Sequence, residues 1–207
     1  MPEELCGSVM IGVVEQPATK AHRTTEELEA GLGHVRASPV AQGTLELIVR
    51  RPDVDRREIL EEATLDLDVG LLGDTWSVRG STSTPDGKAH PDAQLTLTNA
   101  RAVALVAGDD DVERWALAGD QLFVDLALGE ESLPAGSRLA IGEAVVEVTA
   151  KPHRGCAKFA ARFGNDALRF VNTGAGLALN LRGRNAKVVT PGRIRRGDAV
   201  RLLPPAT

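Results

Sequence analysis

Three short runs of the sequence decide the fold: Gln121-Leu122-Phe123-Val124-Asp125-Leu126, Arg138-Leu139-Ala140-Ile141 and Glu143-Ala144-Val145-Val146-Glu147-Val148-Thr149. Each run is rich in apolar and β-branched residues, and prolines and glycines separate the runs, as is typical of β-strands joined by turns. Outside them, strands are predicted at residues 44–49, 65–69, 94–99, 185–190 and 199–203. Strands that recur about every ten residues indicate a barrel or a sandwich rather than alternating βα units.

Helical patterns are fewer and shorter. We predict helices at residues 56–64, 157–163 and 166–171, with Asn165 as the N-cap of the last, a further helical turn at 177–181 and a tight turn at 191–192. Near the start, Thr24 or Thr25 is placed to cap a short helix whose first turn is acidic. The helices after Cys156 therefore form an insertion between strands of a mainly β domain.

The chain is long enough to build a core of its own. Its 207 residues are 43% hydrophobic and 26% charged, which is the mixture of globular proteins rather than of disordered chains. Residues 1–42 lack sustained periodicity, so we expect an N-terminal extension that is loosely structured or packed on the barrel. Residues 43–203 are expected to form the β-barrel domain.

Nothing in the sequence suggests a membrane segment or a signal peptide. No stretch approaches the roughly 20 apolar residues needed to cross a bilayer. The start, Met1-Pro2-Glu3-Glu4, is acidic where a signal peptide is basic. We expect a soluble, cytoplasmic protein that does not act on membranes.

The net charge of −5 hides an asymmetry along the chain. Residues 1–150 carry a charge of −15, whereas residues 151–207 carry +10. A cationic tail favours an anionic partner, but a pI near 5.4 and an aromatic content of 3% argue against nucleic acid. An anionic ligand of limited size is therefore the expected partner of the tail.

The two cysteines are too few for a disulfide framework. Cys156 lies in Lys151-Pro152-His153-Arg154-Gly155-Cys156-Ala157-Lys158, where the cations and the expected helix N-terminus favour a thiolate over a thiol. We predict that Cys156 is a nucleophile, oriented or deprotonated by His153; the alternative is a buried, inert thiol. Cys6 has acidic neighbours, which disfavour the thiolate, and we treat it as incidental.

Other polar residues give weaker signals. His22, His34 and His90 have no partner at metal-ligand spacing, and His90 before Pro91 suits a turn. The cations of the tail could surround an anionic group near Cys156 or lie on a solvated strand surface; they are Arg182, Arg184, Lys187, Arg193, Arg195 and Arg196. The roles of Asp74, Arg79 and Asp120 are open, because turns and salt bridges explain them as well as ligand contacts do.

The cysteine run resembles a known motif. Pro152-His153-Arg154-Gly155-Cys156-Ala157-Lys158-Phe159, with Arg162-Phe163-Gly164 and Asp166-Ala167, is similar to the cysteine motif of the MOSC domain, the module at the C-terminus of eukaryotic molybdenum cofactor sulfurase and in free-standing bacterial proteins. Blocks at 70–74, 119–122, 133–142, 185–189 and 197–198 agree in order, so the resemblance covers roughly residues 43–202. Two departures are Gly155, where many members have Pro, and Thr75-Trp76, where Arg-His is frequent.

The resemblance implies a pyruvate-kinase-type barrel and a cysteine that carries sulfur as a persulfide or binds the molybdenum cofactor through its sulfur. On this chain that residue is Cys156, a catalytic residue together with His153 and the candidate metal ligand. The candidate cofactor-binding residues are Arg154, Lys158, Arg162, Arg182, Arg184, Asn185 and Lys187. Sulfur must come from a cysteine desulfurase or another donor, because 207 residues leave no room for a pyridoxal-phosphate desulfurase domain; we expect no pyridoxal phosphate here.

Two other functions stay open from the sequence. The first is a molybdenum-dependent reductase of N-hydroxylated compounds, which needs a separate electron donor because the sequence has no flavin or iron–sulfur motif. The second is a non-catalytic binding module for an anionic metabolite, in which Cys156 is only packed. The sequence leaves undecided whether the chain is a sulfur carrier, an oxidoreductase or not an enzyme.

Overall fold

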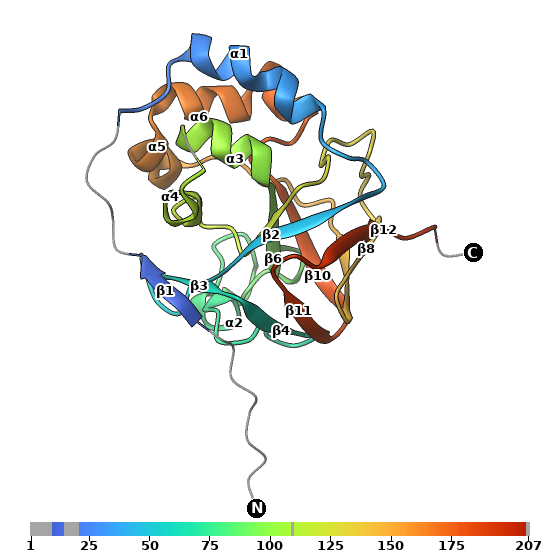
Figure 1. Cartoon of the computed structure of the whole chain (residues 1–207). Helices are drawn as coiled ribbons and strands as arrows, with labels where there is room; N and C mark the ends of the chain where they lie inside the picture. The colour runs from blue at the N-terminus through green and yellow to red at the C-terminus, as the bar shows by residue number, and fades with distance from the viewer. Residues whose placement is uncertain (1–9, 15–20, 109, 206–207) are drawn as a thin grey trace, which may run out of the picture.

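A computed structural model describes residues 10–14, 21–108 and 110–205, and seven of its strands close into a barrel (Figure 1). In order around the barrel they are β2 (Gln42–Arg50), β12 (Ala199–Leu202), β8 (Arg138–Ile141), β9 (Ala144–Val148), β10 (Arg184–Thr190), β6 (Leu95–Asn99) and β7 (Leu122–Val124). The barrel closes because β2 pairs with β12 on one side and with β7 on the other. The mainly β, barrel-type fold expected from the sequence is confirmed.

Alternation along the strands explains how the barrel is filled. In β9, Ala144, Val146 and Val148 are buried, whereas the two residues between them are partly exposed. The buried set packs inside the barrel with apolar residues of every other barrel strand. Two-residue periodicity of this kind places one face of a strand on the core and the other toward its surroundings.

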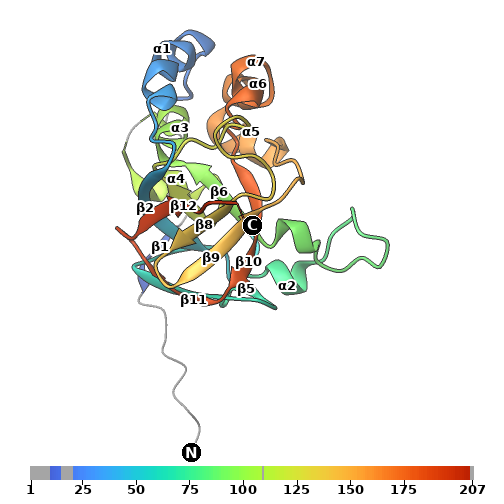
Figure 2. The same ribbon diagram turned by 90° about the vertical axis from the view of Figure 1, so that its right-hand side faces the viewer.

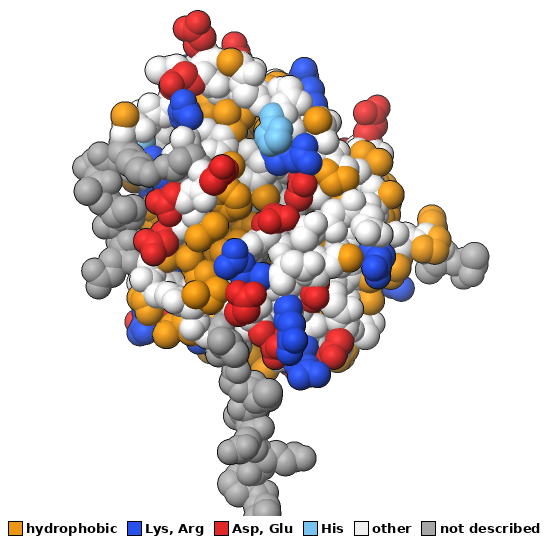
Figure 3. All heavy atoms as spheres, in the orientation of Figure 1, with side chains coloured by type: hydrophobic (Ala, Val, Ile, Leu, Met, Phe, Trp, Pro, Cys, Tyr) orange, Lys and Arg blue, Asp and Glu red, His pale blue; other side chains and the backbone are white. Residues whose placement is uncertain are grey.

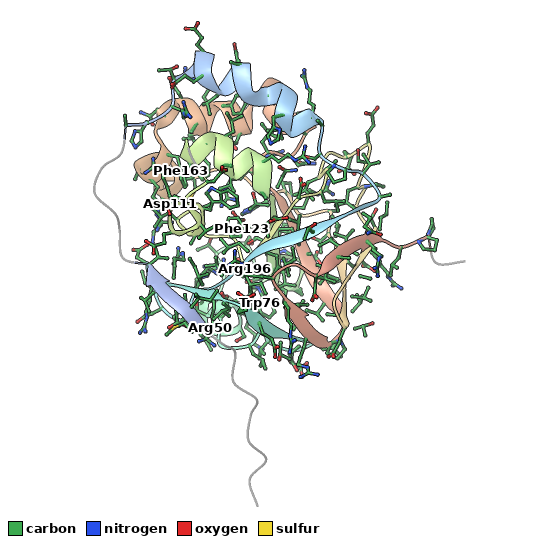
Figure 4. All side chains as sticks on the ribbon, in the orientation of Figure 1. Arg50, Trp76, Asp111, Phe123, Phe163 and Arg196 are labelled. Atoms are coloured by element: carbon green, nitrogen blue, oxygen red, sulfur yellow. The ribbon has the colours of Figure 1, made fainter. Side chains whose placement is uncertain are left out.

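A layer of helices covers one end of the barrel (Figures 1 and 2). It consists of α1 (Thr25–Arg36), α3 (Ala100–Ala107), α4 (Val112–Ala116), α5 (Ala157–Phe163), α6 (Asn165–Asn172) and α7 (Gly174–Ala178). A second hydrophobic core lies between this layer and the barrel, and Phe123 of β7 belongs to it, while its neighbours Leu122 and Val124 face the barrel interior. Figure 4 shows Phe123 between Phe163 of the helical layer and the lower part of the barrel.

The N-terminal residues that the structure describes are ordered on the domain. Thr24 caps α1 in a capping box with Glu27, as the sequence suggested, and α1 buries Leu28, Leu32 and Val35 in the second core. Before it, β1 (Met10–Val14) pairs with β3 at the edge of the sheet. Cys6 lies outside the described residues.

The helix predicted at residues 56–64 is wrong. These residues form β3 (Arg57–Leu60) and β4 (Glu62–Asp66), and β3 is buried along its whole length because it pairs with both β1 and β2. Tertiary strand pairing therefore overrides a local pattern that fits a helix. The predicted strand at 65–69 is correct only for its first two residues, since the chain turns at 67–69 before β5 (Gly70–Leu71).

Further elements differ from the sequence expectations. Residues 192–195 form β11 (Gly192–Arg195), which pairs with β4, where we expected only a turn. Helix α6 has Gly164 at its N-cap, and Asn165 is its first residue. Helix α3 was not predicted, because its nearly uniform apolar sequence shows no clear periodicity.

The expected loop at 81–92 follows α2 (Trp76–Arg79) and contains the short 3₁₀ helix η1 (Pro91–Ala93). His90 caps η1 by accepting a hydrogen bond from the Asp92 amide at Nδ1, which confirms its turn role. Among the described residues, no helix has the length and apolar character required to span a bilayer.

Phe123 offers a direct test of the junction between barrel and helices. Replacing Phe123, which is fully buried, with alanine should lower the free energy of unfolding by about 3–5 kcal/mol, because a large cavity would remain. Urea denaturation followed by fluorescence measures this loss. Val78→Ala is the control: its side chain is 81% exposed, and the change should leave stability within about 0.5 kcal/mol of the wild type. An equal effect of both substitutions would contradict the assignment.

Candidate functional site

The segment 151–156, the cysteine loop, joins β9 to α5 and has three side-chain anchors. Asn185 donates to the carbonyl oxygens of Lys151 and Pro152, at 3.1 and 3.2 Å. His153 contacts Asp120, and the backbone of Gly155 is held by Asn172. The loop has no regular secondary structure of its own, so these anchors determine where it presents Cys156.

Asn172 holds the residue that precedes the cysteine by two reciprocal hydrogen bonds. Its side-chain oxygen accepts from the Gly155 amide at 2.9 Å, and its amide nitrogen donates to the Gly155 carbonyl at 3.1 Å. A Cβ atom at Gly155 would lie only 2.8 Å from a methyl group of Leu168. Lack of space against α6 therefore favours glycine at this position.

Cys156 is a free, exposed cysteine at the N-cap position of α5. Its side chain makes no capping hydrogen bond, and its exposure leaves the thiol accessible to a partner. The alternative of a buried, inert thiol is therefore wrong. Behind it, Phe159 and Phe163 anchor α5 in the second core, with ring centroids 4.9 Å apart.

A buried triad lies beside the loop. His153 Nε2 is 2.9 Å from Asp120 Oδ1, and Arg182 Nη1 donates to Asp120 Oδ2 at 2.6 Å. Burial alone would raise the pKa of Asp120, but Arg182 and His153 outweigh it and hold that pKa at about 2. Burial, reinforced by the charge of Arg182, lowers the pKa of His153 despite the opposing effect of Asp120.

These directions assign the protons of the triad. An ionised carboxylate can only accept hydrogen bonds, so Nε2 of His153 must donate to Asp120. The lowered pKa of His153 keeps the ring neutral near pH 7, which leaves Nδ1 with a lone pair. His153 therefore presents a proton acceptor at Nδ1, in the orientation that Asp120 imposes.

Three arginines hold the turn that carries Asp120. Arg162, on α5, donates to the Leu117 carbonyl at 2.7 Å; Arg182, before β10, donates to Ala118 at 2.9 Å. Arg51, just after β2, donates to Gly119 at 2.9 Å. These consecutive carbonyls follow the last turn of α4, where carbonyl groups lack helical partners and cations are favourable.

Each of these arginines is also paired with a carboxylate. Arg51 binds Asp74 through two hydrogen bonds of 2.8 Å, and Arg162 donates to Asp55 at 2.8 Å. Arg182 pairs with Asp120 as described. For Asp74 and Asp120, whose roles the sequence left open, the structure shows salt bridges that build the site.

The sequence-predicted cations fall into two groups. Lys158 and Arg162 share Asp55, and Arg182 lies over the Phe159 ring at 5.1 Å. Arg162 and Arg182 also contact the 117–119 turn, whereas Arg154 is an exposed residue of the cysteine loop itself. Asn185, predicted to bind a cofactor, anchors the loop backbone instead.

The remaining cations are paired elsewhere on the barrel. Arg184 binds Glu130, and Lys187 binds Glu147 on the neighbouring strand. Arg193, Arg195 and Arg196 lie on or just after β11 and pair with Glu143, Glu62 and Glu61, respectively. Figure 4 places Arg196 well away from Phe163 of α5, and Figure 3 shows acidic and basic side chains intermixed over the lower part of that face.

Sequence reasoning missed the contributions of Arg51 and Asp55 to the site. The arginine doublets at 50–51 and 56–57 were a possible signal, since they flank a single turn. Asp55, in that turn, has a left-handed backbone with φ of 57° and receives hydrogen bonds from α5.

Among the described residues, no group of three or more histidine, cysteine or acidic side chains could hold a metal ion.

The Asn172 clamp leads to a prediction about the cysteine loop. Asn172→Ala removes both hydrogen bonds to Gly155 and should cost about 1–3 kcal/mol of stability. It should also speed hydrogen exchange at the amide of Gly155, which donates to Asn172, measured by mass spectrometry. Asn165→Ala, at the exposed start of α6, is the control and should leave this amide protected; unchanged exchange in Asn172→Ala would contradict the clamp.

The triad predicts a two-step loss of stability in acid. Folded-state pKa values of His153 and Asp120 lie below the ordinary 6.5 and 3.8, so the unfolded chain binds protons first and the free energy of unfolding falls as pH decreases. The His153 contribution is lost below 6.5; that of Asp120, about 2 kcal/mol, is lost between about pH 4 and 2. Urea denaturation across this range should show the first step vanish in His153→Gln, and an unchanged profile would refute the assignment.

The family model described as the MOSC domain matches residues 84–201. No curated protein matches the chain in sequence.

Solved structures share the fold at low sequence identity. The YuaD protein from Bacillus subtilis is 16% identical, with a TM-score of 0.55 over 78% of this chain and 95% of that one. YiiM from Escherichia coli is 20% identical, with a TM-score of 0.50 over 79% of this chain and 71% of that one. A hypothetical protein is 21% identical, with a TM-score of 0.51 over 79% and 70%.

Proposed function

Because the chain belongs to the MOSC domain family, we propose that Cys156 accepts and carries sulfur as a persulfide, or binds the molybdenum cofactor through its sulfur. The observation that carries the proposal is an exposed thiol on a loop anchored by three polar side chains. A structural cysteine needs burial rather than presentation. A sulfur carrier needs an exposed cysteine, because its partner must reach the sulfur.

The sulfur-transfer step is a thiolate exchange. The Cys156 thiolate attacks the outer sulfur of a donor persulfide, a new S–S bond forms on Cys156, and the donor S–S bond breaks to release the donor thiolate. No net oxidation occurs, since the sulfane sulfur keeps its oxidation state. The donor is a cysteine desulfurase or another persulfide-bearing protein.

His153 is proposed to prepare the cysteine for this attack. Its Nδ1 carries the lone pair, since Nε2 donates to Asp120. A neutral imidazole with one nitrogen committed to a carboxylate is suited to take a thiol proton at the other. Arg182 acts through Asp120, which it holds ionised and in place.

The residues present are compatible with the molybdenum cofactor. Thiolate sulfur is a ligand that suits soft metal centres, and the Cys156 sulfur is exposed. Buried Arg182 Nε has no hydrogen-bond partner among the described residues, so the site retains an unused donor near the loop. Cys156 would ligate the metal, Arg154 and Lys158 would bind anionic parts of the cofactor, and the bound cofactor would supply redox chemistry.

Native mass spectrometry of anaerobically purified protein tests the proposal. Wild-type protein from a host that makes persulfide donors and molybdenum cofactor should carry either one extra sulfur atom or a molybdopterin mass with metal. Cys156→Ser should carry neither. The same samples are analysed for molybdenum, so that sulfur carriage and cofactor binding are distinguished.

A matched control separates the role of the sulfur from that of folding. Thr173→Ser, at an exposed site between α6 and α7, should load as the wild type does. Equal loading of wild type and Cys156→Ser would overturn the proposal. Absence of any adduct from the wild type in a competent host would also overturn the proposal.

A further inference from the structure

A groove lies where the turn before β8 meets the chain segment that ends β12 and follows it. Its cavity of about 450 Å³ is lined by residues 134–138, by Glu147 of β9 and by residues 202–205. Backbone pairing joins the two segments, since the Leu203 amide donates to the Arg138 carbonyl at 2.9 Å. We call this cavity the C-terminal groove.

Much of the lining of the C-terminal groove is apolar. Pro134 and Ala135 are exposed on the turn before β8, and Pro204 and Pro205 are exposed on the other segment, after the half-buried Leu203. Proline has a fixed φ and no amide hydrogen, so the two consecutive prolines present apolar surface without a backbone donor. Walls of this kind lose little conformational freedom when an apolar ligand covers them.

A row of three charged side chains crosses β8, β9 and β10, and its first two members line the groove. Arg138 lies opposite Glu147 in the β8–β9 register, and Glu147 lies opposite Lys187 in the β9–β10 register. Arg138 Nε donates to Glu147 Oε2, and Lys187 Nζ pairs with Glu147 Oε1, both at 3.1 Å. Two cations therefore share one carboxylate, and the row keeps one unit of positive charge.

Glu147 leaves donors of this row unused. The hydrogen bond from Lys187 and, to a smaller extent, the one from Arg138 lower the pKa of Glu147, which keeps its carboxylate ionised. The Arg138 side chain is 46% exposed, and its two Nη groups have no acceptor among the described residues. An arginine fork beside apolar walls is therefore available to an anion that carries apolar atoms of its own.

We propose that the C-terminal groove binds a small carboxylic acid with an apolar chain or ring. The carboxylate accepts hydrogen bonds from the Nη groups of Arg138, whose planar fork matches its two oxygens, and the apolar part lies against Leu203 and the prolines. The cavity volume is in the range of small-molecule sites, which favours a free acid. No described residue of the groove belongs to the cysteine loop or the buried triad, so this binding is separate from the chemistry of Cys156.

Titrations with octanoate test the groove in the wild-type chain. Octanoate, octylammonium and acetate are compared by isothermal titration calorimetry at matched ionic strength, because they separate the sign of the charge from the apolar chain. Octanoate should bind saturably at one site. The other two should bind about tenfold or more weakly, since octylammonium lacks the anionic group and acetate lacks the apolar surface. Non-saturable octanoate binding, or equally tight binding of octylammonium or acetate, would overturn the proposal.

Two substitutions with opposite effects locate the carboxylate of the ligand. Arg138→Gln should weaken octanoate binding about tenfold, because charge-assisted hydrogen bonds are lost. Glu147→Gln should strengthen it, because Arg138 and Lys187 no longer share a carboxylate, whereas a mere disturbance of the groove would weaken binding in both variants. Arg169→Gln, at an exposed arginine of α6, is the control and should bind as the wild type does. Undiminished binding by Arg138→Gln, or no gain of affinity in Glu147→Gln, would overturn the proposal.

Filling the groove gives an independent readout. Ala135→Trp should abolish octanoate binding, because Ala135 is exposed and lines the cavity, so that the indole ring occupies the space of the ligand. Ala30→Trp is the matched control: it adds the same ring at an exposed position of α1 and should leave binding unchanged. Both variants should melt at the temperature of the wild type, since neither alanine is buried. Equal octanoate binding by the two tryptophan variants would contradict the site.

Discussion

Hydrogen bonds from three arginines to three consecutive carbonyls, those of Leu117, Ala118 and Gly119, support the whole site. The arginines come from α5, from the segment before β10 and from the residue just after β2. The turn therefore connects α5, which begins after Cys156, to the ends of two barrel strands. Because the carbonyls follow the last turn of a helix, they have no helical donors, and guanidinium groups satisfy them while favouring the negative end of the helix dipole.

The turn positions the chemistry of the cysteine loop. Asp120 is the next residue, and Arg182 keeps its carboxylate ionised. The carboxylate can therefore only accept a hydrogen bond, which His153 donates from Nε2. The loop is thus anchored in its middle by a charged network and at its ends by Asn185 and Asn172. An otherwise irregular segment can hold an exposed cysteine in one place because its polar partners are buried or partly buried and belong to regular elements or to the turn before β7.

Parts of the fold and site were predictable from the sequence. The runs of alternating residues gave correct strands at β8, β9 and β10, and the bounds of α5 agree with the predicted helix. The segment 56–64 was mistaken for a helix because β3 is buried on both sides and shows no two-residue alternation. Cations of the tail looked equivalent in sequence, but carboxylates on neighbouring strands and on the β8–β9 turn engage Lys187 and the arginines of β11.

The sequence by itself determined that the chain is mainly β, with a cysteine motif at a helix start that resembles the MOSC domain, because strand alternation and the motif depend on neighbouring residues. Only the tertiary structure decided which side chains join Cys156. Arg51 meets Gly119 across 68 positions and Arg182 meets Asp120 across 62. Such pairs arise from barrel closure, which brings distant segments together, and no local pattern records them.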